Sequence, residues 1–207
     1  MGEQVRAPRR QARGERRIQE ILDAAAKVFA EAGYEAATTN RIAAAAGISP
    51  GSLYQFFSNK EAIAQALADR FVEQMGRAHR EAFESGDLVG PLLPEMIDRM
   101  LDPILAFNIA NPGFKALFAR PDMPAGLASA ARPIQTALLG RVEAVLAARA
   151  PGVPEGERAR SARVMIQIFQ AMVPLVTSSR GDEREAMITE VKKVLRGYLE
   201  PLEQRRA

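Results

Sequence analysis

The stretch TTNRIAAAAGISPGSLYQFFSNKE, residues 38–61, decides how this chain folds. Its first half predicts a short helix whose first turn is capped by the side-chain oxygen of either Thr38 or Thr39. Gly47 interrupts that helix, and Ser49-Pro50 opens another, because proline at the first helical position loses no hydrogen bond. Two short helices with a glycine between them predict a helix-turn-helix.

Small and apolar residues in the same stretch fit the packing of this motif. Ala43 is small where the two helices approach each other, and Gly47 suits a turn that demands a positive φ. The expected small core consists of Ile42, Ile48, Leu53 and Phe56. Small and polar residues remain on the exposed front of the second helix, where they can hydrogen-bond to base edges: Ser49, Pro50, Gly51, Ser52 and Gln55.

One helix is predicted before this stretch and a longer one at its end. Apolar residues recur at intervals of three and four from Arg17 to Ala32, and Gly33 supplies a left-handed stop. Ser58 and Glu61 have the spacing of a capping box, which predicts the start of a fourth helix.

The rest of the chain is also helical in pattern. Further helices are expected near residues 95–110, 114–118, 126–148, 156–178 and 183–203. No run alternates with a period of two for long enough to form a strand, and alanine is abundant. The sequence therefore predicts an all-α fold.

The composition disfavours several classes of protein. Of 207 residues 47% are apolar, which is enough for a core, and the absence of cysteine removes disulfides and thiolate chemistry. A multi-histidine metal centre or a serine–histidine relay would have to rest on His79 alone. The uncharged stretch 164–179 is too short for a membrane helix. We expect a cytoplasmic protein without a cofactor.

Positive charge is concentrated at the N-terminal end. Residues 1–60 contain nine Lys or Arg against six Asp or Glu, whereas residues 61–207 contain 19 of each. Six arginines fall within the first seventeen residues, and we expect residues 1–16 to form a flexible basic arm. A basic front on a neutral body suggests that one end meets a polyanion, although a solvated tail that touches nothing is the alternative.

These residues resemble a known family. The segments that carry the resemblance are Phe29-Ala-Glu-Ala-Gly33, Thr38-Thr39, Ile42-Ala43, Ala46-Gly47-Ile48-Ser49, Gly51-Ser52-Leu53-Tyr54, Phe57 and Lys60-Glu61. They are similar to the DNA-binding region of the TetR family of bacterial transcriptional regulators. The similarity runs over about residues 17–63, and beyond it the likeness is one of architecture only.

The resemblance implies a DNA-binding domain over residues 17–60 and a helical regulatory domain over residues 61–207. It implies phosphate contacts from Thr39, Tyr54 and Lys60. Ser49, Gly51 and Ser52 would lie against bases or backbone in the groove, and Gln55 would read a base. Phe56 stands where the family often has a polar aromatic residue, so one phosphate contact is in doubt.

A dimer interface and a ligand pocket are also implied. The last two helices, over about residues 156–203, would pair with those of a second copy, since a two-fold dimer reads two half-sites. The interface candidates are Ile168, Leu175, Val191, Leu195 and Tyr198. The pocket would lie within about residues 61–178, with Met96, Met100, Phe107, Phe114, Phe118, Met165, Phe169 and Met172 as candidate lining, although such residues at helical spacing are also ordinary core. His79 is expected at the surface.

The leading hypothesis is a ligand-responsive repressor. A homodimer would bind an inverted-repeat operator in double-stranded DNA and release it when a small hydrophobic or weakly polar effector occupies the helical body. The alternatives are a ligand-independent regulator or activator with the same DNA-binding head, or a helical small-molecule binding protein or enzyme. The sequence shows no nucleophile–base pair, so no enzymatic activity is expected, and neither is a membrane partner.

Overall fold

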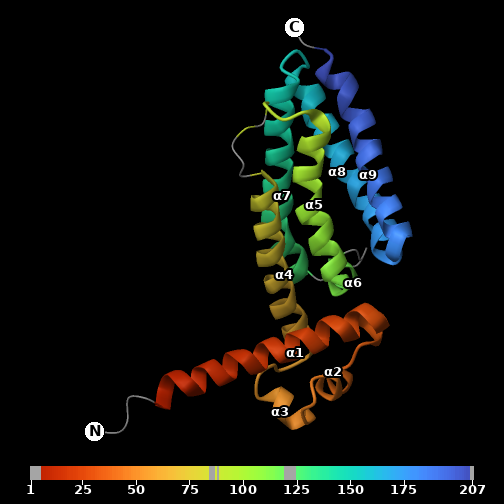
Figure 1. Cartoon of the computed structure of the whole chain (residues 1–207). Coiled ribbons are helices and arrows are strands. Elements are labelled where there is room, and N and C mark those ends of the chain that lie inside the picture. Colours follow the sequence, from red (N-terminus) through yellow and green to blue (C-terminus); the bar gives the residue numbers. More distant parts are fainter. Residues whose placement is uncertain (1–5, 84–86, 88, 119–124, 206–207) are drawn as a thin grey trace. The chain divides into compact units, whose positions relative to one another are not determined.

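A computed structural model describes residues 6–83, 87, 89–118 and 125–205. All regular structure in these ranges is helical, which confirms the all-α class (Figure 1). The helices are α1 (Arg6–Ala36), α2 (Thr39–Ala45), α3 (Pro50–Tyr54), α4 (Lys60–Phe83), α5 (Leu93–Ala110), α6 (Pro112–Phe118), α7 (Ala125–Arg149), α8 (Glu155–Ser178) and α9 (Gly181–Glu203).

The chain forms two compact units. The first contains Met1–Phe71 and Asn111–Ala130, and the second contains Val72–Ala110 and Ala131–Ala207. The first unit therefore includes a segment from the middle of the chain. This division differs from the boundary at residue 60 that the sequence suggests.

The helix α1 is the longest element of the first unit. Its apolar face is buried, and the chain leaves helical geometry at Gly33, where φ is 73°. The helix begins at Arg6, eleven residues before the expected start at Arg17. Arginine, glutamine and alanine are good helix formers, and Glu20 extends ion pairs to arginines one turn earlier, which favours the longer helix.

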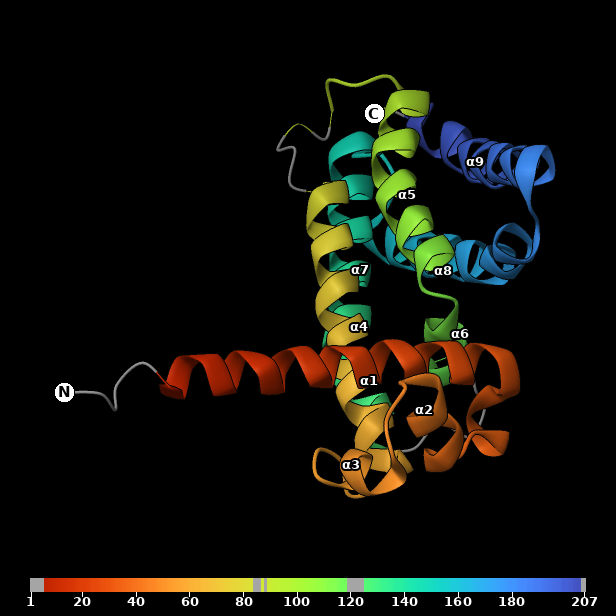
Figure 2. The same cartoon turned by 60° about the horizontal axis from the view of Figure 1, so that its bottom comes forward.

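The short helix α6 packs tightly against α1. A Cβ added to Gly113 would lie 2.7 Å from the carbonyl oxygen of Ala26, so the two backbones are closer than any side chain would allow. Phe114 lies edge-on to Phe71, with 5.8 Å between the ring centroids. In both views α6 lies on one side of α1 and α3 on the other (Figures 1 and 2).

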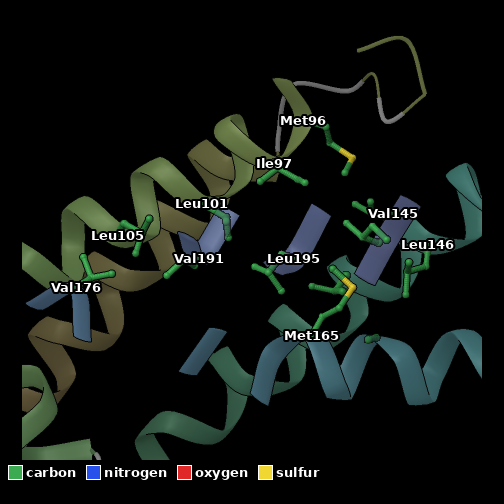
Figure 3. Packing of buried hydrophobic residues seen from close by; sticks show 13 residues of the cluster. Met96, Ile97, Leu101, Leu105, Val145, Leu146, Met165, Val176, Val191 and Leu195 are labelled. Atoms are coloured by element: carbon green, nitrogen blue, oxygen red, sulfur yellow. The ribbon is translucent and has the colours of Figure 1, made fainter. Parts of the chain in front are cut away.

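The second unit has its own apolar core. Residues of α5, α7, α8 and α9 meet in one cluster, part of which Figure 3 shows. The fully buried members include Met96, Leu105, Leu146, Ala162, Val176, Val191 and Leu195. The core of this unit thus combines side chains from helices that are up to about 100 residues apart in the sequence.

Three ion pairs, made by two basic side chains, join helices of the second unit around this core. The buried guanidinium of Arg149 pairs with Glu203 and donates to the carbonyl oxygen of Pro91 at 3.0 Å. On α9, the ammonium of Lys192 lies 2.9 Å from Asp98 and 2.6 Å from Asp102, both on α5. These contacts join α9 to α7 and to α5.

The expectation for His79 is wrong. Its side chain lies on α4 in the second unit and is only 3% exposed, because it follows Met75 by one helical turn on the buried face. Burial, and then the positive charge of Arg141, lowers the pKa of His79 to about 4. The imidazole is therefore neutral near pH 7, and its Nδ1 atom has no hydrogen-bond partner among the described residues.

Candidate nucleic-acid interface

Local hydrogen bonds define the start of α2. Thr38, not Thr39, is the N-cap: its backbone is extended and its hydroxyl accepts from the backbone N–H of Arg41 at 3.2 Å. This settles the choice that the sequence leaves open. Thr39 is then the first helical residue, half-buried, with its hydroxyl directed to the side of the helix that faces Tyr54.

The turn between α2 and α3 has the expected geometry. Gly47 adopts a φ of 66°, which other residues rarely adopt, and the N–H of Ile48 donates to the carbonyl of Ala43 at 3.0 Å. Ser49 caps α3 by accepting from the N–H of Ser52 at 3.1 Å, and Pro50 occupies the first turn. These local contacts fix the direction in which α3 leaves the turn.

The core beneath the two helices differs from the prediction at Phe56, and Ile48 is only half-buried. Ile42, Ala43 and Leu53 are fully buried, but Phe56 is 36% exposed and Phe57 takes the inward position at 9%. The physical reason is that the helical spacing continues past Tyr54: the backbone N–H of Phe57 donates to the carbonyl oxygen of Leu53 at 3.1 Å, and this places Phe57 one turn beyond Leu53 on the buried face.

The expected capping box at α4 is also wrong. The helix begins at Lys60, one residue later than that box requires, and Asn59 is the capping residue. Its Oδ1 atom accepts from the backbone N–H of Ala62 at 2.7 Å. The amide side chain of Asn59 thus takes the role that the spacing assigned to Ser58.

Hydroxyl groups gather on the exposed side of α2 and α3. The hydroxyls of Thr39 and Tyr54 are 3.1 Å apart, and those of Ser49 and Ser52 are 2.9 Å apart. Tyr54 is 52% exposed, and Gln55 beside it is exposed as well. The structure therefore brings most of the expected DNA-contacting side chains to one surface.

Gly51 lies on the same surface, at the start of α3. A Cβ added there would meet nothing nearer than the hydroxyl of Ser49, 3.9 Å away. A side chain at this position would therefore not clash with the rest of the chain. Because the residue is glycine, another molecule can approach the backbone of α3 closely here.

Lys60 has a different environment from the one expected. Its ammonium donates to the carbonyl oxygens of Tyr34 at 2.9 Å and Glu35 at 3.2 Å, and lies 4.4 Å from the centre of the Tyr34 ring. Next to it, the hydroxyl of Tyr34 donates to Glu61 at 3.4 Å. Lys60 therefore ties the first turn of α4 to the end of α1.

The charge of this surface suits an anionic partner. Residues 36–60 contain no Asp or Glu, while Arg41 and Lys60 are both positive. Polar hydroxyls, an exposed amide and the exposed Arg41 together can accommodate phosphates and base edges.

The candidate pocket residues fall into both units. Met96 and Met165 are buried in the core cluster of the second unit, with Met100, Phe169 and Met172 packed against it. Phe107 is buried on α5. Phe118 belongs to the first unit, where its ring lies 4.7 Å from that of Phe114.

The candidate dimer residues differ sharply in exposure. Val191 and Leu195 are 1% and 3% exposed within a single chain, so they are core residues and offer almost no surface to a partner. The period of α9 turns them inward. Leu175 is 50% exposed, and Ile168 and Tyr198 are half-buried. Periodicity alone missed two further apolar residues at the surface, Val164 and Val194, which are 42% and 40% exposed.

No helix within the described residues is both long and apolar enough to span a membrane.

Comparison with known proteins identifies the family of both parts of the chain. The model of "Bacterial regulatory proteins, tetR family" matches residues 21–67, and that of "Tetracyclin repressor-like, C-terminal domain" matches residues 93–199. The first match covers α2, the turn and α3. The second covers α5 to α9 and by itself spans half of the chain.

Curated relatives are transcriptional regulators and not enzymes. The HTH-type transcriptional repressor KstR2 of Rhodococcus jostii is 43% identical over 67 residues, which are 32% of this chain and 33% of that protein. The A-factor receptor protein of Streptomyces griseus is 47% identical over 60 residues, 29% of this chain and 22% of that protein. The chain thus matches a third or less of the length of these relatives.

Solved structures extend the similarity to nearly the whole chain. A TetR-family transcriptional regulator from Streptomyces coelicolor is 30% identical, with a TM-score of 0.58 over 91% of this chain and 98% of that one. A TetR-like regulator from Rhodococcus sp. RHA1 shares the fold at a TM-score of 0.70 and 21% identity over 88% of this chain and 92% of that one. With helix-turn-helix geometry, both family models and these structures in agreement, the chain belongs to the TetR family of bacterial transcriptional regulators.

Proposed function

We propose that this protein is a ligand-responsive repressor that binds an inverted-repeat DNA operator as a homodimer. The observation that carries the proposal is the surface of α2 and α3, where hydroxyl groups and an open backbone face outward over a buried Ile42, Ala43 and Leu53. A helix held this firmly at its base can enter the major groove without rearrangement.

Each residue on this surface has a proposed role in DNA binding. Thr39 and Tyr54 bond to phosphates, and their mutual contact of 3.1 Å positions both hydroxyls before DNA arrives. Ser49, Gly51 and Ser52 lie against the groove, and Gln55 reads a base edge through its amide. Lys60 contributes by holding α4 to α1 through the carbonyls of Tyr34 and Glu35.

The homodimer is supported by apolar residues on α8 and α9. Val164, Ile168 and Leu175 recur on one face of α8 at intervals of four and seven residues, and they are exposed or half-buried. Val194 and Tyr198 do the same on α9. Apolar stripes of this kind on two neighbouring helices suit a self-complementary, two-fold interface.

The effector is proposed to be a small hydrophobic or weakly polar molecule that binds in the helical body. Five of the candidate residues, Met96, Met100, Met165, Phe169 and Met172, belong to one cluster of the second unit. Methionine side chains adapt readily to a bound molecule. The effector changes operator affinity only if it binds the DNA-competent and DNA-free states with different affinities.

An in vitro selection tests the DNA-binding function directly. The full-length protein is used to select duplexes from a random library, and affinity for the selected duplex is then measured by fluorescence anisotropy. We expect an inverted repeat, and we expect Tyr54→Phe to weaken its binding by about 1–2 kcal/mol because a phosphate hydrogen bond is lost. Gln55→Ala should relax the preference for one base of each half-site by about 1–3 kcal/mol.

Gln204→Ala serves as the matched control, since Gln204 is exposed at the end of α9 in the other unit. It should bind like the unchanged protein. If a Tyr54 and Gln55 double substitution leaves affinity unchanged, this surface does not contact DNA. If no sequence is selected at all, the regulatory function is wrong.

A further inference from the structure

The N-terminal part of α1 carries positive charge in a regular pattern. The helix is continuous from Arg6, and arginine occurs at positions 6, 9, 10, 13, 16 and 17, which are spaced by three, four and seven. At about 100° per residue these six positions fall within an arc of about 120°. We call them the arginine stripe. Because the backbone is helical from Arg6 on, these positions lie on one side of α1.

The described part of the stripe is accessible. Arg13 and Arg16 are exposed, and the side chain of Arg17 is 42% exposed. Arg16 and Arg17 lie 3.6 Å and 2.6 Å from the carboxylate of Glu20, itself 43% exposed. Exposed ion pairs of this kind contribute little to stability, so these arginines can exchange Glu20 for another anion at small cost.

The contact between α1 and α6 shows which way the stripe faces. Ala26, whose carbonyl oxygen meets Gly113 of α6, lies about 140° around the helix from the middle of the stripe. The stripe is therefore turned away from α6, and α3 lies on the opposite side of α1 from α6 (Figures 1 and 2). The arginine stripe thus faces the side of the first unit that carries the recognition helix.

A second residue agrees with this direction. Ala24 follows Arg17 by seven residues, or two helical turns, and so continues the line of the stripe. It is only 4% exposed, so other helices of the unit cover this face of α1 beyond Arg17. In Figure 2 the N-terminal end of α1 extends beyond α2, α3 and the start of α4.

We infer that the arginine stripe is a second DNA-binding surface, which lies along the phosphate backbone of the duplex that flanks each operator half-site. This inference rests on the proposed function and adds to it a helical contact outside the helix-turn-helix. Residues 6–17 span about 16 Å as a helix, which corresponds to about five base pairs. Contacts to phosphates do not distinguish one base from another. The stripe therefore increases the affinity and the length of duplex that the protein contacts, and α3 still selects the sequence.

The register of the helix gives a direct test. Two alanines inserted between Arg17 and Ile18 rotate the stripe by about 200° and face it away from the DNA, whereas four alanines rotate it by about 40° and nearly restore it. Both variants keep every arginine and a helix-forming spacer. A third variant, Arg13→Gln with Arg16→Gln and Arg17→Gln, removes the described charges without touching the core.

Each protein is titrated at several salt concentrations with the selected duplex in two lengths, one trimmed to the inverted repeat and one with flanks of about ten base pairs. On the long duplex we expect the two-alanine and glutamine variants to bind at least about tenfold more weakly than the unchanged protein. Their plot of log affinity against log salt should be less steep by about 0.9 for each phosphate that the arginines no longer neutralise. The four-alanine variant should retain most of the affinity, and the trimmed duplex should bind all proteins alike.

Several results would overturn the inference. Equal binding by the two insertion variants would mean that the arginines act as a tail without register, and an unchanged salt dependence in the glutamine variant would mean that they do not meet phosphates. Binding of the unchanged protein, but not of the glutamine variant, to vesicles of anionic phospholipid in preference to the long duplex would assign the stripe to a membrane surface. Circular dichroism confirms that each variant is folded, and selection of an inverted repeat by all of them would leave the proposed function intact.

Discussion

The two units of the molecule are held together in different ways. In the first, contacts between near neighbours in the sequence define the elements, such as the Thr38, Ser49 and Asn59 caps and the left-handed Gly47. In the second, the decisive contacts join distant residues: Arg149 pairs with Glu203, 54 residues later, and Lys192 pairs with Asp98 and Asp102. The helix-turn-helix part of the first unit is specified locally, whereas the second unit is specified by its tertiary contacts.

This difference fits the tasks that we propose for the two units. A surface that inserts into DNA needs a fixed geometry. Helix caps and a glycine turn provide it with only a few residues. A body that responds to an effector needs two conformations of similar free energy. Contacts between helices that are distant in the sequence can break and re-form together when the body changes from one conformation to the other. Variants that change one unit at a time can show whether the other unit responds.

The largest effect is expected from Arg149→Met. The substitution leaves Glu203 without its buried partner and frees the carbonyl of Pro91, so the second unit should lose about 4 kcal/mol of stability. Hydrogen exchange measured by mass spectrometry should show faster exchange in α5, α7 and α9, with α2 and α3 little changed. A double variant that also carries Glu203→Met should recover much of the loss, because no unpaired charge remains. Equal loss of protection in both units would contradict the contrast between them.

A similar magnitude is expected for the pH dependence that His79 confers on the second unit. Its folded pKa of about 4 lies below the unfolded value of 6.5, so the unfolded chain binds the proton first as pH falls. The contribution of neutral His79 to the free energy of unfolding is therefore fully present above pH 6.5. It falls by about 3 kcal/mol in total as the pH is lowered from 6.5 to 4. Urea unfolding at several pH values should show a shallower acid decline in His79→Leu. Parallel curves for the two proteins would show that His79 is not buried in the neutral form.

A smaller effect should follow from Gly113→Ala in the first unit. The new Cβ would lie 2.7 Å from the carbonyl oxygen of Ala26, so α6 must move away from α1 at a cost of about 2 kcal/mol. Gly140→Ala is the matched control on α7, since no atom lies within 4 Å of its added Cβ, and it should raise stability by up to about 1 kcal/mol. Faster amide exchange in α6 for the first variant alone is the expected result. Two variants of equal stability would mean that α6 does not depend on this close approach.

Features that could be predicted from the sequence follow the same division. A threonine cap at position 38 or 39, the cap at Ser49, the turn at Gly47 and the all-α class were predictable because each depends on residues a few positions apart. The errors inside the first unit are small shifts, as with Asn59 in place of Ser58, since several neighbours could supply the capping oxygen.

Larger errors arose where burial depends on the partner of a helix. Periodicity shows that α9 has an apolar face but does not tell whether Val191 or Val194 points into the core of its own chain. In the same way, nothing in the sequence near Gly113 reveals that it meets Ala26, nor near His79 that its face of α4 is covered. These features depend on contacts across 25 or more residues, which a local pattern cannot contain.

The smallest loss of stability is expected for a substitution of Lys60, the residue whose environment differs most from the one that the sequence predicts. Lys60→Met removes the hydrogen bonds to Tyr34 and Glu35, and it should cost the first unit about 1 kcal/mol because the ammonium is partly solvated. Operator affinity should fall because α4 then starts from a less fixed position. The slope of log affinity against log salt should stay the same, since these hydrogen bonds go to backbone carbonyls and not to phosphates. Tyr34→Leu, which removes the ring but no charge, should act in the same direction. If Lys60→Met alone makes the salt dependence less steep by about 0.9 per subunit, its ammonium leaves α1 to bind a phosphate in the complex, and its hydrogen bonds to α1 belong to the DNA-free state only.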